Sequence, residues 1–183
     1  MERNVLIGGY GGQGVQTLGQ LLGHGANEEG GYVTFHAEYG GEMRGGTSNC
    51  TVTRSDRPIG APNKKMCDFI VAMNIPSFDR FEANVKPGGL FIYNTSIVQD
   101  AQPKRSDIET VGVPFNEIAE NEVGSIKTLN IVALAFFCEY THFVAPDVMK
   151  DVVIERMGGK KEYLELNKKA FDIGVAKAKE IKN

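Results

Sequence analysis

Five glycines fall within the seven residues between Ile7 and Val15, directly after a short apolar run. Because glycine adopts backbone conformations that other residues avoid, so dense a cluster predicts a sharp bend or the close approach of another group. After it, apolar residues recur at the spacing of one helix face, at Val15, Leu18, Leu21, Leu22 and Ala26. The segment is therefore predicted to be a strand, a glycine turn and a helix N-terminus, whose exposed N–H groups suit a phosphate or carboxylate.

Within the turn, Gly9, Gly11 and Gly14 satisfy the pattern G-x-G-x-x-G that is typical of dinucleotide-binding folds. A complete dinucleotide site also needs an acidic residue at the tip of the second strand, which holds the ribose hydroxyls. Here that tip reads Phe-His-Ala, and Glu38 lies slightly beyond it. Three interpretations stay open: a site for a nucleotide or phosphate group, a dinucleotide site, and a turn that merely packs closely.

A second glycine-rich segment has paired glycines on either side of Glu42, Met43 and Arg44. It follows the second predicted strand, at the carboxyl end where α/β folds collect ligands. Arg44 is therefore predicted to bind a phosphate or a carboxylate through its forked guanidinium group. The alternative is that Glu42 and Arg44 are solvated or pair with each other. Asn74 follows the fourth predicted strand, where it either lines a binding crevice or caps a helix.

Strand-like and helix-like segments alternate through the first two-thirds of the chain, which predicts an α/β fold. We expect a three-layer α/β/α Rossmann-like domain with a mixed, mostly parallel sheet and a helical C-terminal region. The antiparallel member should be Thr47–Arg54, because no helix separates it from the preceding strand. A tight turn is expected at Pro87-Gly88-Gly89. Residues 1–183 are predicted to form a single domain, with an α/β core at 1–114 and helices at 115–183.

The predicted strands are Asn4–Ile7, Tyr32–His36, Thr47–Arg54, Phe69–Met73, Leu90–Asn94 and Thr110–Val113. The predicted helices are Val15–Asn27, Ser77–Val85, Phe115–Glu120, Thr128–Tyr140, Asp147–Met157 and Lys161–Ile181.

Composition excludes several classes of function. The formal charge of −3 and the pI near 5.7 argue against a nucleic-acid partner. The most apolar stretch, Leu129 to Phe137 with Asn130 inside it, is too short to cross a membrane and is expected to be a buried helix. The three cysteines stand alone, so no zinc site or iron–sulfur cluster is indicated. Because the first strand starts within five residues of Met1, no signal peptide is expected and a cytoplasmic location is predicted.

Taken together, the motifs resemble the gamma subunit of the 2-oxoacid:ferredoxin (acceptor) oxidoreductases, over almost the entire chain. The resemblance rests on Gly9-Tyr10-Gly11-Gly12-Gln13-Gly14-Val15, on the segment from Tyr39 to Cys50 that contains Glu-Met-Arg-Gly-Gly-Thr, on Ser55-Asp56-Arg57-Pro58-Ile59, on Ala72-Met73-Asn74-Ile75-Pro76-Ser77, on Lys86-Pro87-Gly88-Gly89, and on Thr128-Leu129-Asn130-Ile131-Val132-Ala133-Leu134.

The resemblance implies a complex that converts a 2-oxoacid and coenzyme A (CoA) to acyl-CoA and CO2 and reduces ferredoxin. Thiamine diphosphate and the iron–sulfur clusters would belong to partner subunits of the alpha, beta and delta types, and this chain would contain no catalytic residue. It would support CoA binding and closure over the active site. The Glu-Met-Arg-Gly-Gly-Thr version is similar to that of members acting on 2-oxoglutarate or a branched 2-oxoacid rather than pyruvate. The predicted cofactor-binding residues are Gly9, Gly11, Gly12, Gln13, Gly14, Glu42, Arg44 and Asn74.

Two other functions stay open on the residues alone. One is an autonomous oxidoreductase that binds NAD or a flavin, which the missing ribose-binding acid disfavours. The other is an assembly subunit that binds no ligand, with glycines that serve only as packing contacts.

Overall fold

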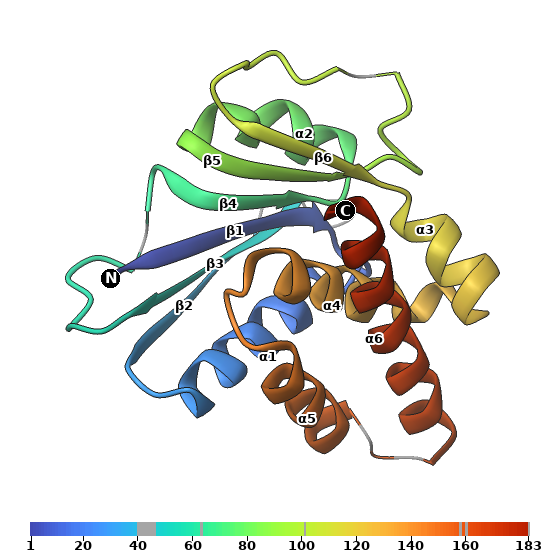
Figure 1. Ribbon diagram of the computed structural model, residues 1–183. Coiled ribbons are helices and arrows are strands. Elements are labelled where there is room, and N and C mark those ends of the chain that lie inside the picture. The colour runs from blue at the N-terminus through green and yellow to red at the C-terminus, as the bar shows by residue number, and fades with distance from the viewer. Residues whose placement is uncertain (40–46, 63, 101, 158, 160, 183) are drawn as a thin grey trace.

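The computed structural model describes residues 1–183 except 40–46, 63, 101, 158, 160 and 183. Its centre is a six-stranded sheet with the strand order β2-β3-β1-β4-β5-β6 (Figure 1). The strands are β1 (Arg3–Tyr10), β2 (Tyr32–Tyr39), β3 (Thr47–Ser55), β4 (Cys67–Ala72), β5 (Val85–Asn94) and β6 (Glu109–Val113).

The sheet is mixed, as predicted, and β3 is the strand that runs against the others. It pairs antiparallel with both β1 and β2, whereas the pairs β1–β4, β4–β5 and β5–β6 are parallel. The apolar side chains of β3, Cys50 and Val52, are buried beneath α1 (Val15–Glu28). Cys50 Sγ lies 3.5 Å from the carbonyl oxygen of Val15, which is the first residue of this helix. The carboxyl ends of β1, β2, β4, β5 and β6 therefore lie at one edge of the sheet, which we call the carboxyl edge; their first residues define the amino edge.

Helices cover both faces of the sheet, which confirms the three-layer α/β/α prediction. On one face, α2 (Ile75–Phe81) packs against β1 and β4. On the other face lie α1, α4 (Leu129–Thr141), α5 (Pro146–Met157) and α6 (Lys161–Lys182) (Figure 1). Shorter elements connect them, namely the 3-10 turns Glu82–Asn84 and Ile126–Thr128, the short helix α3 (Phe115–Glu117) and the π-helical turn Ile118–Val123.

The core explains why α4 is apolar on every side. Residues 129–138 are all buried, because α4 lies between the sheet, α1, α5 and α6. Its close neighbour α6 approaches through Gly174, where an added Cβ would lie 2.5 Å from the carbonyl oxygen of Val132. The stretch predicted to be a buried helix is therefore the central helix of the fold.

Three local predictions are wrong in detail. The helix expected at Ser77–Val85 begins earlier, because Asn74 caps it and Pro76 fits its first turn, and it ends at Phe81. The expected turn at Pro87-Gly88-Gly89 lies inside β5, where the pairing with β4 is irregular and Gly88 has φ +74°. The helix expected at Phe115–Glu120 is a single helical turn followed by the π-helical turn, which Gly124 ends at φ +100°.

Candidate functional site

The glycine turn joins β1 to α1 at the carboxyl edge. Gly12 and Gly14 have φ values of +96° and +74°, which favour glycine over every L-residue. Gly14 is the N-cap of α1, and among the described residues no side chain caps this helix end. The first turn of α1 also carries no acidic residue. The backbone N–H groups of that turn and the positive end of the helix dipole therefore remain available to an anion.

The side chain of Gln13 stabilises this turn through two hydrogen bonds. Its Oε1 accepts a hydrogen bond from the backbone N–H of Tyr10 at 2.7 Å, and its Nε2 donates to the carbonyl oxygen of Met73 at 3.1 Å. The side chain thus ties the turn to the residue after β4. In the structure Gln13 stabilises the turn, and its predicted contact with a ligand stays a prediction.

The glycines of the turn differ in what surrounds them. At Gly9 an added Cβ would lie 2.7 Å from a methyl of Val15 and 2.8 Å from Gln13 Oε1, so this glycine is required by packing. At Gly14 it would lie 2.7 Å from the carboxamide of Asn130. At Gly11 the space within 4 Å holds none of the described atoms, and the backbone does not need a positive φ. The fold itself therefore gives no reason for a glycine at position 11.

The carboxyl ends of three strands meet beside this turn. The carbonyl oxygen of Gly8 accepts a hydrogen bond from the Met73 N–H at 2.8 Å, and Asn94 at the end of β5 donates to the Met73 carbonyl at 3.4 Å. Asn94 also donates to Asn116 Oδ1 at 2.8 Å. These contacts fix the strand ends in one place, as the sequence predicted for the edge of a parallel sheet.

Asn74 lies at the same edge but is fully buried. Its Oδ1 accepts the Ser77 N–H at 2.9 Å and so caps α2. The helix-cap interpretation is therefore confirmed for Asn74, and its predicted ligand contact stays a prediction.

Glu42 and Arg44 lie outside the described residues, but the residues that flank their segment are placed. Tyr39 is the last residue of β2, and Thr47 is the first residue of β3. Thr47 pairs with Tyr10, which opens the glycine turn. The segment that carries Arg44 therefore leaves and re-enters the sheet at the carboxyl edge.

Asn130 is a residue at this edge that the sequence-based site left out. It stands in the first turn of α4, is 7% exposed, and packs against the N-cap of α1. The signal was present in the sequence as the one polar residue between Leu129 and Phe137. The sequence alone does not reveal the contact between Asn130 and Gly14, because the two residues are far apart along the chain.

The three cysteines are buried, and their thiols are poor nucleophiles. Burial raises the pKa of Cys50 and of Cys67 to about 12 and raises the pKa of Cys138 further, which disfavours the nucleophilic thiolate. Within the described part of the chain, no three His, Cys, Asp or Glu side chains gather as a metal site would require. Nor does any helix there have the length and apolar character needed to span a membrane.

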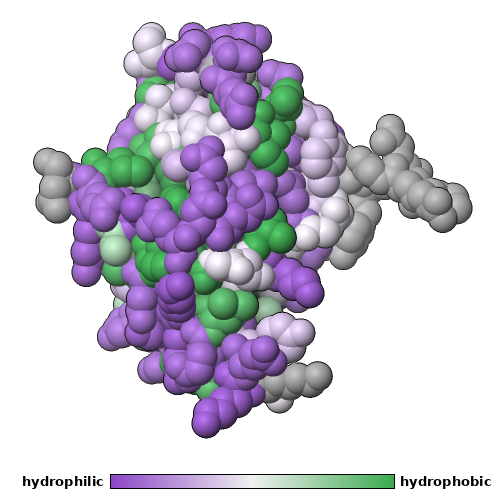
Figure 2. Space-filling model, turned by 90° about the vertical axis from the view of Figure 1, so that its right-hand side faces the viewer, coloured by the Kyte–Doolittle hydropathy of each residue, from purple (hydrophilic) through white to green (hydrophobic). Residues whose placement is uncertain are grey.

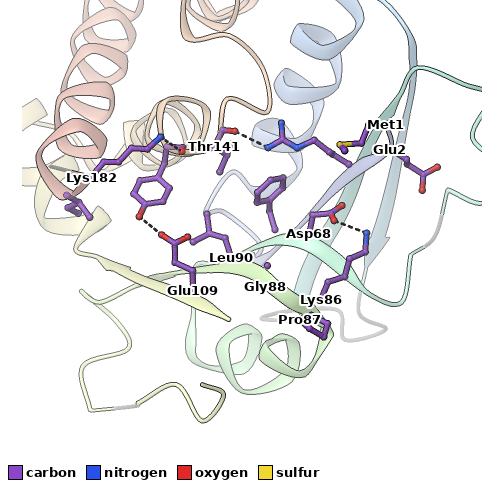
Figure 3. A pocket seen from close by; sticks show the side chains of 15 residues that line it. Met1, Glu2, Asp68, Lys86, Pro87, Gly88, Leu90, Glu109, Thr141 and Lys182 are labelled. Atoms are coloured by element: carbon purple, nitrogen blue, oxygen red, sulfur yellow. Dashed lines mark hydrogen bonds and ion pairs between the residues drawn. The ribbon is translucent and has the colours of Figure 1, made fainter. Parts of the chain in front are cut away.

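A cleft of about 790 Å³ lies at the opposite, amino edge of the sheet (Figure 3). It separates the first residues of the parallel strands from the C-terminal ends of α4 and α6. Each of its six charged side chains has a partner within the protein. The partners are Lys64 for Glu2, the carbonyls of Thr141 and His142 for Arg3, Lys86 for Asp68, Tyr140 for Glu109, and the Tyr140 carbonyl for Lys182.

On the surface toward which β1 points, small hydrophobic patches lie among hydrophilic residues (Figure 2). No single apolar area dominates the part of this face that the described residues form. The glycine turn is a better candidate site than the amino-edge cleft, because available N–H donors lie there beside the ends of three strands.

Comparison with known proteins identifies the family of the chain. A family model described as pyruvate ferredoxin/flavodoxin oxidoreductase matches residues 4–177. The ketoisovalerate oxidoreductase subunit VorA of Methanothermobacter marburgensis is 33% identical over 95% of this chain. That match covers 36% of VorA, so the chain spans about a third of the length of this relative.

Two solved structures have the same fold. The gamma subunit of a keto/oxoacid ferredoxin oxidoreductase from Geobacter sulfurreducens is 28% identical, with a TM-score of 0.86 and 98% of each chain covered. A 2-oxoglutarate:ferredoxin oxidoreductase from Magnetococcus marinus, solved with 2-oxoglutarate, coenzyme A and succinyl-CoA bound, gives a TM-score of 0.89 at 23% identity. The match covers 98% of this chain and 31% of that one, and it shows a likeness of fold alone.

Proposed function

The chain belongs to the pyruvate ferredoxin/flavodoxin oxidoreductase family, and from this we propose that it is the gamma subunit of a multi-subunit 2-oxoacid:ferredoxin oxidoreductase. The complex would convert a 2-oxoacid and CoA to acyl-CoA and CO2, with reduction of ferredoxin. The match to a separate gamma subunit along 98% of both chains supports the assignment to this subunit type.

Within that complex, the chain contributes a site for the anionic part of CoA. The observation that carries this proposal is the uncapped N-terminus of α1 behind Gly11 and Gly12, at the edge where three strand ends meet. CoA carries a pyrophosphate and a ribose phosphate, and phosphates bind well at helix N-termini. Arg44, whose segment starts and ends at this edge, would add a charged hydrogen bond. Closure over the active site by this subunit is part of the same proposal.

The preferred substrate is 2-oxoglutarate or a branched 2-oxoacid rather than pyruvate. Support comes from the Glu-Met-Arg-Gly-Gly-Thr segment and from two relatives. One is VorA, named for ketoisovalerate, and the other is the 2-oxoglutarate synthase subunit KorC of Methanocaldococcus jannaschii, 29% identical over 99% of this chain. The substrate itself would bind outside this chain.

The chemistry of the oxo group is assigned to partner subunits of the alpha, beta and delta types. Thiamine diphosphate would supply the decarboxylation there and iron–sulfur clusters the electron transfer to ferredoxin. The buried, high-pKa thiols of this chain suit neither cluster binding nor nucleophilic attack. A cytoplasmic location belongs to this proposal as well.

Purification of the native complex through a tag on this chain tests the assignment. We expect partner chains, thiamine diphosphate, iron–sulfur absorption, and CoA-dependent oxidation of a 2-oxoacid. The isolated chain should be colourless and inactive after anaerobic reconstitution. A single chain that is active with NADH or a flavin would contradict the proposal and favour an autonomous dinucleotide enzyme. A complex whose CoA saturation is unaffected by every change in the glycine turn would favour a purely structural subunit.

A further inference from the structure

Two helix N-termini meet at one point of the carboxyl edge. Gly14 is the N-cap of α1, and Asn130 lies in the first turn of α4. The two touch so closely that a Cβ at Gly14 would lie 2.7 Å from both Cγ and Nδ2 of Asn130. Neither helix has an acidic residue in its first turn, and no described side chain caps either end. The positive ends of two helix dipoles therefore converge, and neither first turn supplies a negative charge to balance them.

The carboxamide of Asn130 has no hydrogen-bond partner among the described residues, although the residue is more than nine-tenths buried. Other amides of this edge differ. Gln13 uses both ends of its side chain, and Asn74 and Asn94 are fully enclosed and each form at least one hydrogen bond. Asn130 retains 7% of its surface, so a group from outside can reach it. The fully buried amide atoms without a hydrogen bond at this edge include Asn74 Nδ2 and Asn94 Oδ1, whereas the amide of Asn130 stays open to solvent, which a ligand could replace.

We infer that Asn130 contacts the anionic ligand of this site and donates a hydrogen bond from Nδ2 to a diphosphate oxygen. The inference deepens the proposed function and rests on it, since the diphosphate is taken to be that of CoA. A diphosphate oxygen beside Gly14 would accept the carboxamide hydrogen and lie in the field of both helix N-termini. The same contact explains why position 14 is glycine, because any side chain there would displace Asn130 from the site.

The test replaces Asn130 with leucine, which is of similar size and removes the amide. If Asn130 only fills space, leucine leaves ligand binding unchanged. If it contacts the ligand, the KM for CoA of the purified complex should rise roughly tenfold or more, as expected for a lost hydrogen bond to a charged group. The inhibition constant of inorganic pyrophosphate, used as a competitor of CoA, should rise by a similar factor. The melting temperature of the full chain should not fall, because the change removes no hydrogen bond within the described chain.

Asn4 offers a matched control at the amino edge. It is also buried, but its Oδ1 accepts the Asp68 N–H at 2.8 Å and its Nδ2 donates to the Met66 carbonyl at 3.4 Å. Asn4→Leu should therefore lower the melting temperature and leave the KM for CoA unchanged, the reverse of Asn130→Leu. Should Asn130→Leu fail to fold, Asn130→Ser provides the affinity measurement in a smaller side chain and should show the same loss.

The outcomes separate this inference from the proposed function. If the wild-type complex saturates with CoA and the Asn130 variants keep normal constants, the inference is overturned and the proposed function stands. If pyrophosphate binds and depends on Asn130 but CoA is not used, the diphosphate contact stands and the proposed function is overturned. If neither CoA nor pyrophosphate binds the wild-type complex, both are overturned.

Discussion

Helices begin at one edge of the sheet and end at the other, and α4 does both. At the carboxyl edge α1 and α4 begin, and the polar groups around Gly14 and Asn130 have no charged partner in the described chain. At the amino edge α4 and α6 end. The carbonyl oxygens of Thr141 and Tyr140 in α4 accept hydrogen bonds from Arg3 at 2.9 Å and from Lys182, the last residue of α6, at 3.1 Å (Figure 3). Cations are favourable at helix C-termini just as anions are favourable at N-termini. Among the described residues, the charged side chains of the amino-edge cleft are therefore paired, whereas the first turns of α1 and α4 at the carboxyl edge carry no negative charge.

This contrast makes the amino-edge cleft a weaker candidate for a binding site than the glycine turn. The amino-edge cleft is roomy, but its charged side chains are already paired with one another or with the backbone. A ligand entering it would have to replace existing hydrogen bonds, which cancels most of the gain. The glycine turn is less enclosed, but the backbone N–H groups at the start of α1 have no acceptor in the described chain.

The largest effect is expected from Gly14→Val, and it should be structural. A valine there must adopt φ near +74° and would collide with the carboxamide of Asn130. Left-handed strain of about 1–2 kcal/mol and overpacking of about 1–3 kcal/mol should lower the free energy of unfolding, as measured by urea denaturation. Gly23→Ala is the control, because position 23 is helical with open space around it and should stabilise α1. Unchanged stability in Gly14→Val would show that the contact between α1 and α4 is not as tight as described.

Arg44→Ala tests the part of the carboxyl edge that lies outside the described residues. Loss of a charged hydrogen bond typically costs on the order of 1.5–3 kcal/mol, so the KM for CoA should rise roughly tenfold or more. Arg44→Lys should be defective too, because lysine lacks the planar fork. Sedimentation of the same variant complex separates a docking role, which would weaken assembly but leave the KM normal. Normal values in both measurements would mean that Arg44 is a solvated residue.

Breaking an ion pair at the amino edge should have a small effect. Lys86 Nζ lies 2.8 Å from Asp68 Oδ1, but the Lys86 side chain is 41% exposed. For so exposed a pair, Lys86→Met should change the free energy of unfolding by no more than about 1 kcal/mol. The KM for CoA should not change. An increased KM in this variant would mean that the amino-edge cleft takes part in binding and would break the contrast between the edges.

Tyr140 at the amino edge should have an effect on stability that is visible only at high pH. Burial, and then the hydrogen bond to Glu109, raises the pKa of Tyr140 to about 12. The unfolded phenol ionises near its ordinary value of about 10. The stability contributed by Tyr140 should therefore be complete below about pH 10 and be lost as the pH rises toward 12. Thermal melts of wild type and Tyr140→Phe between these pH values check this, and identical pH profiles would contradict it.

Local patterns predicted most of the fold because they reflect local physics. The glycine turn, the helix from Val15 and the antiparallel Thr47–Arg54 strand depend on neighbouring residues and were all foreseeable. The turn expected at Pro87-Gly88-Gly89 failed, since the same residue types also suit an irregular strand. The contact between Asn130 and Gly14 could not be predicted, because only tertiary packing places α4 against α1.

The most direct test of the carboxyl-edge site is the CoA KM of complexes carrying Gly11→Ala and Gly11→Leu. Position 11 has ordinary backbone angles and open space among the described atoms, so both variants should fold with the stability of wild type. If CoA lies against this backbone, the KM should rise with side-chain size, by roughly tenfold or more for leucine, as for the loss of a charged contact. A normal KM in both variants, with wild-type melting temperatures, would contradict a CoA site at the carboxyl edge, because nothing would then approach Gly11, a glycine that the fold does not need.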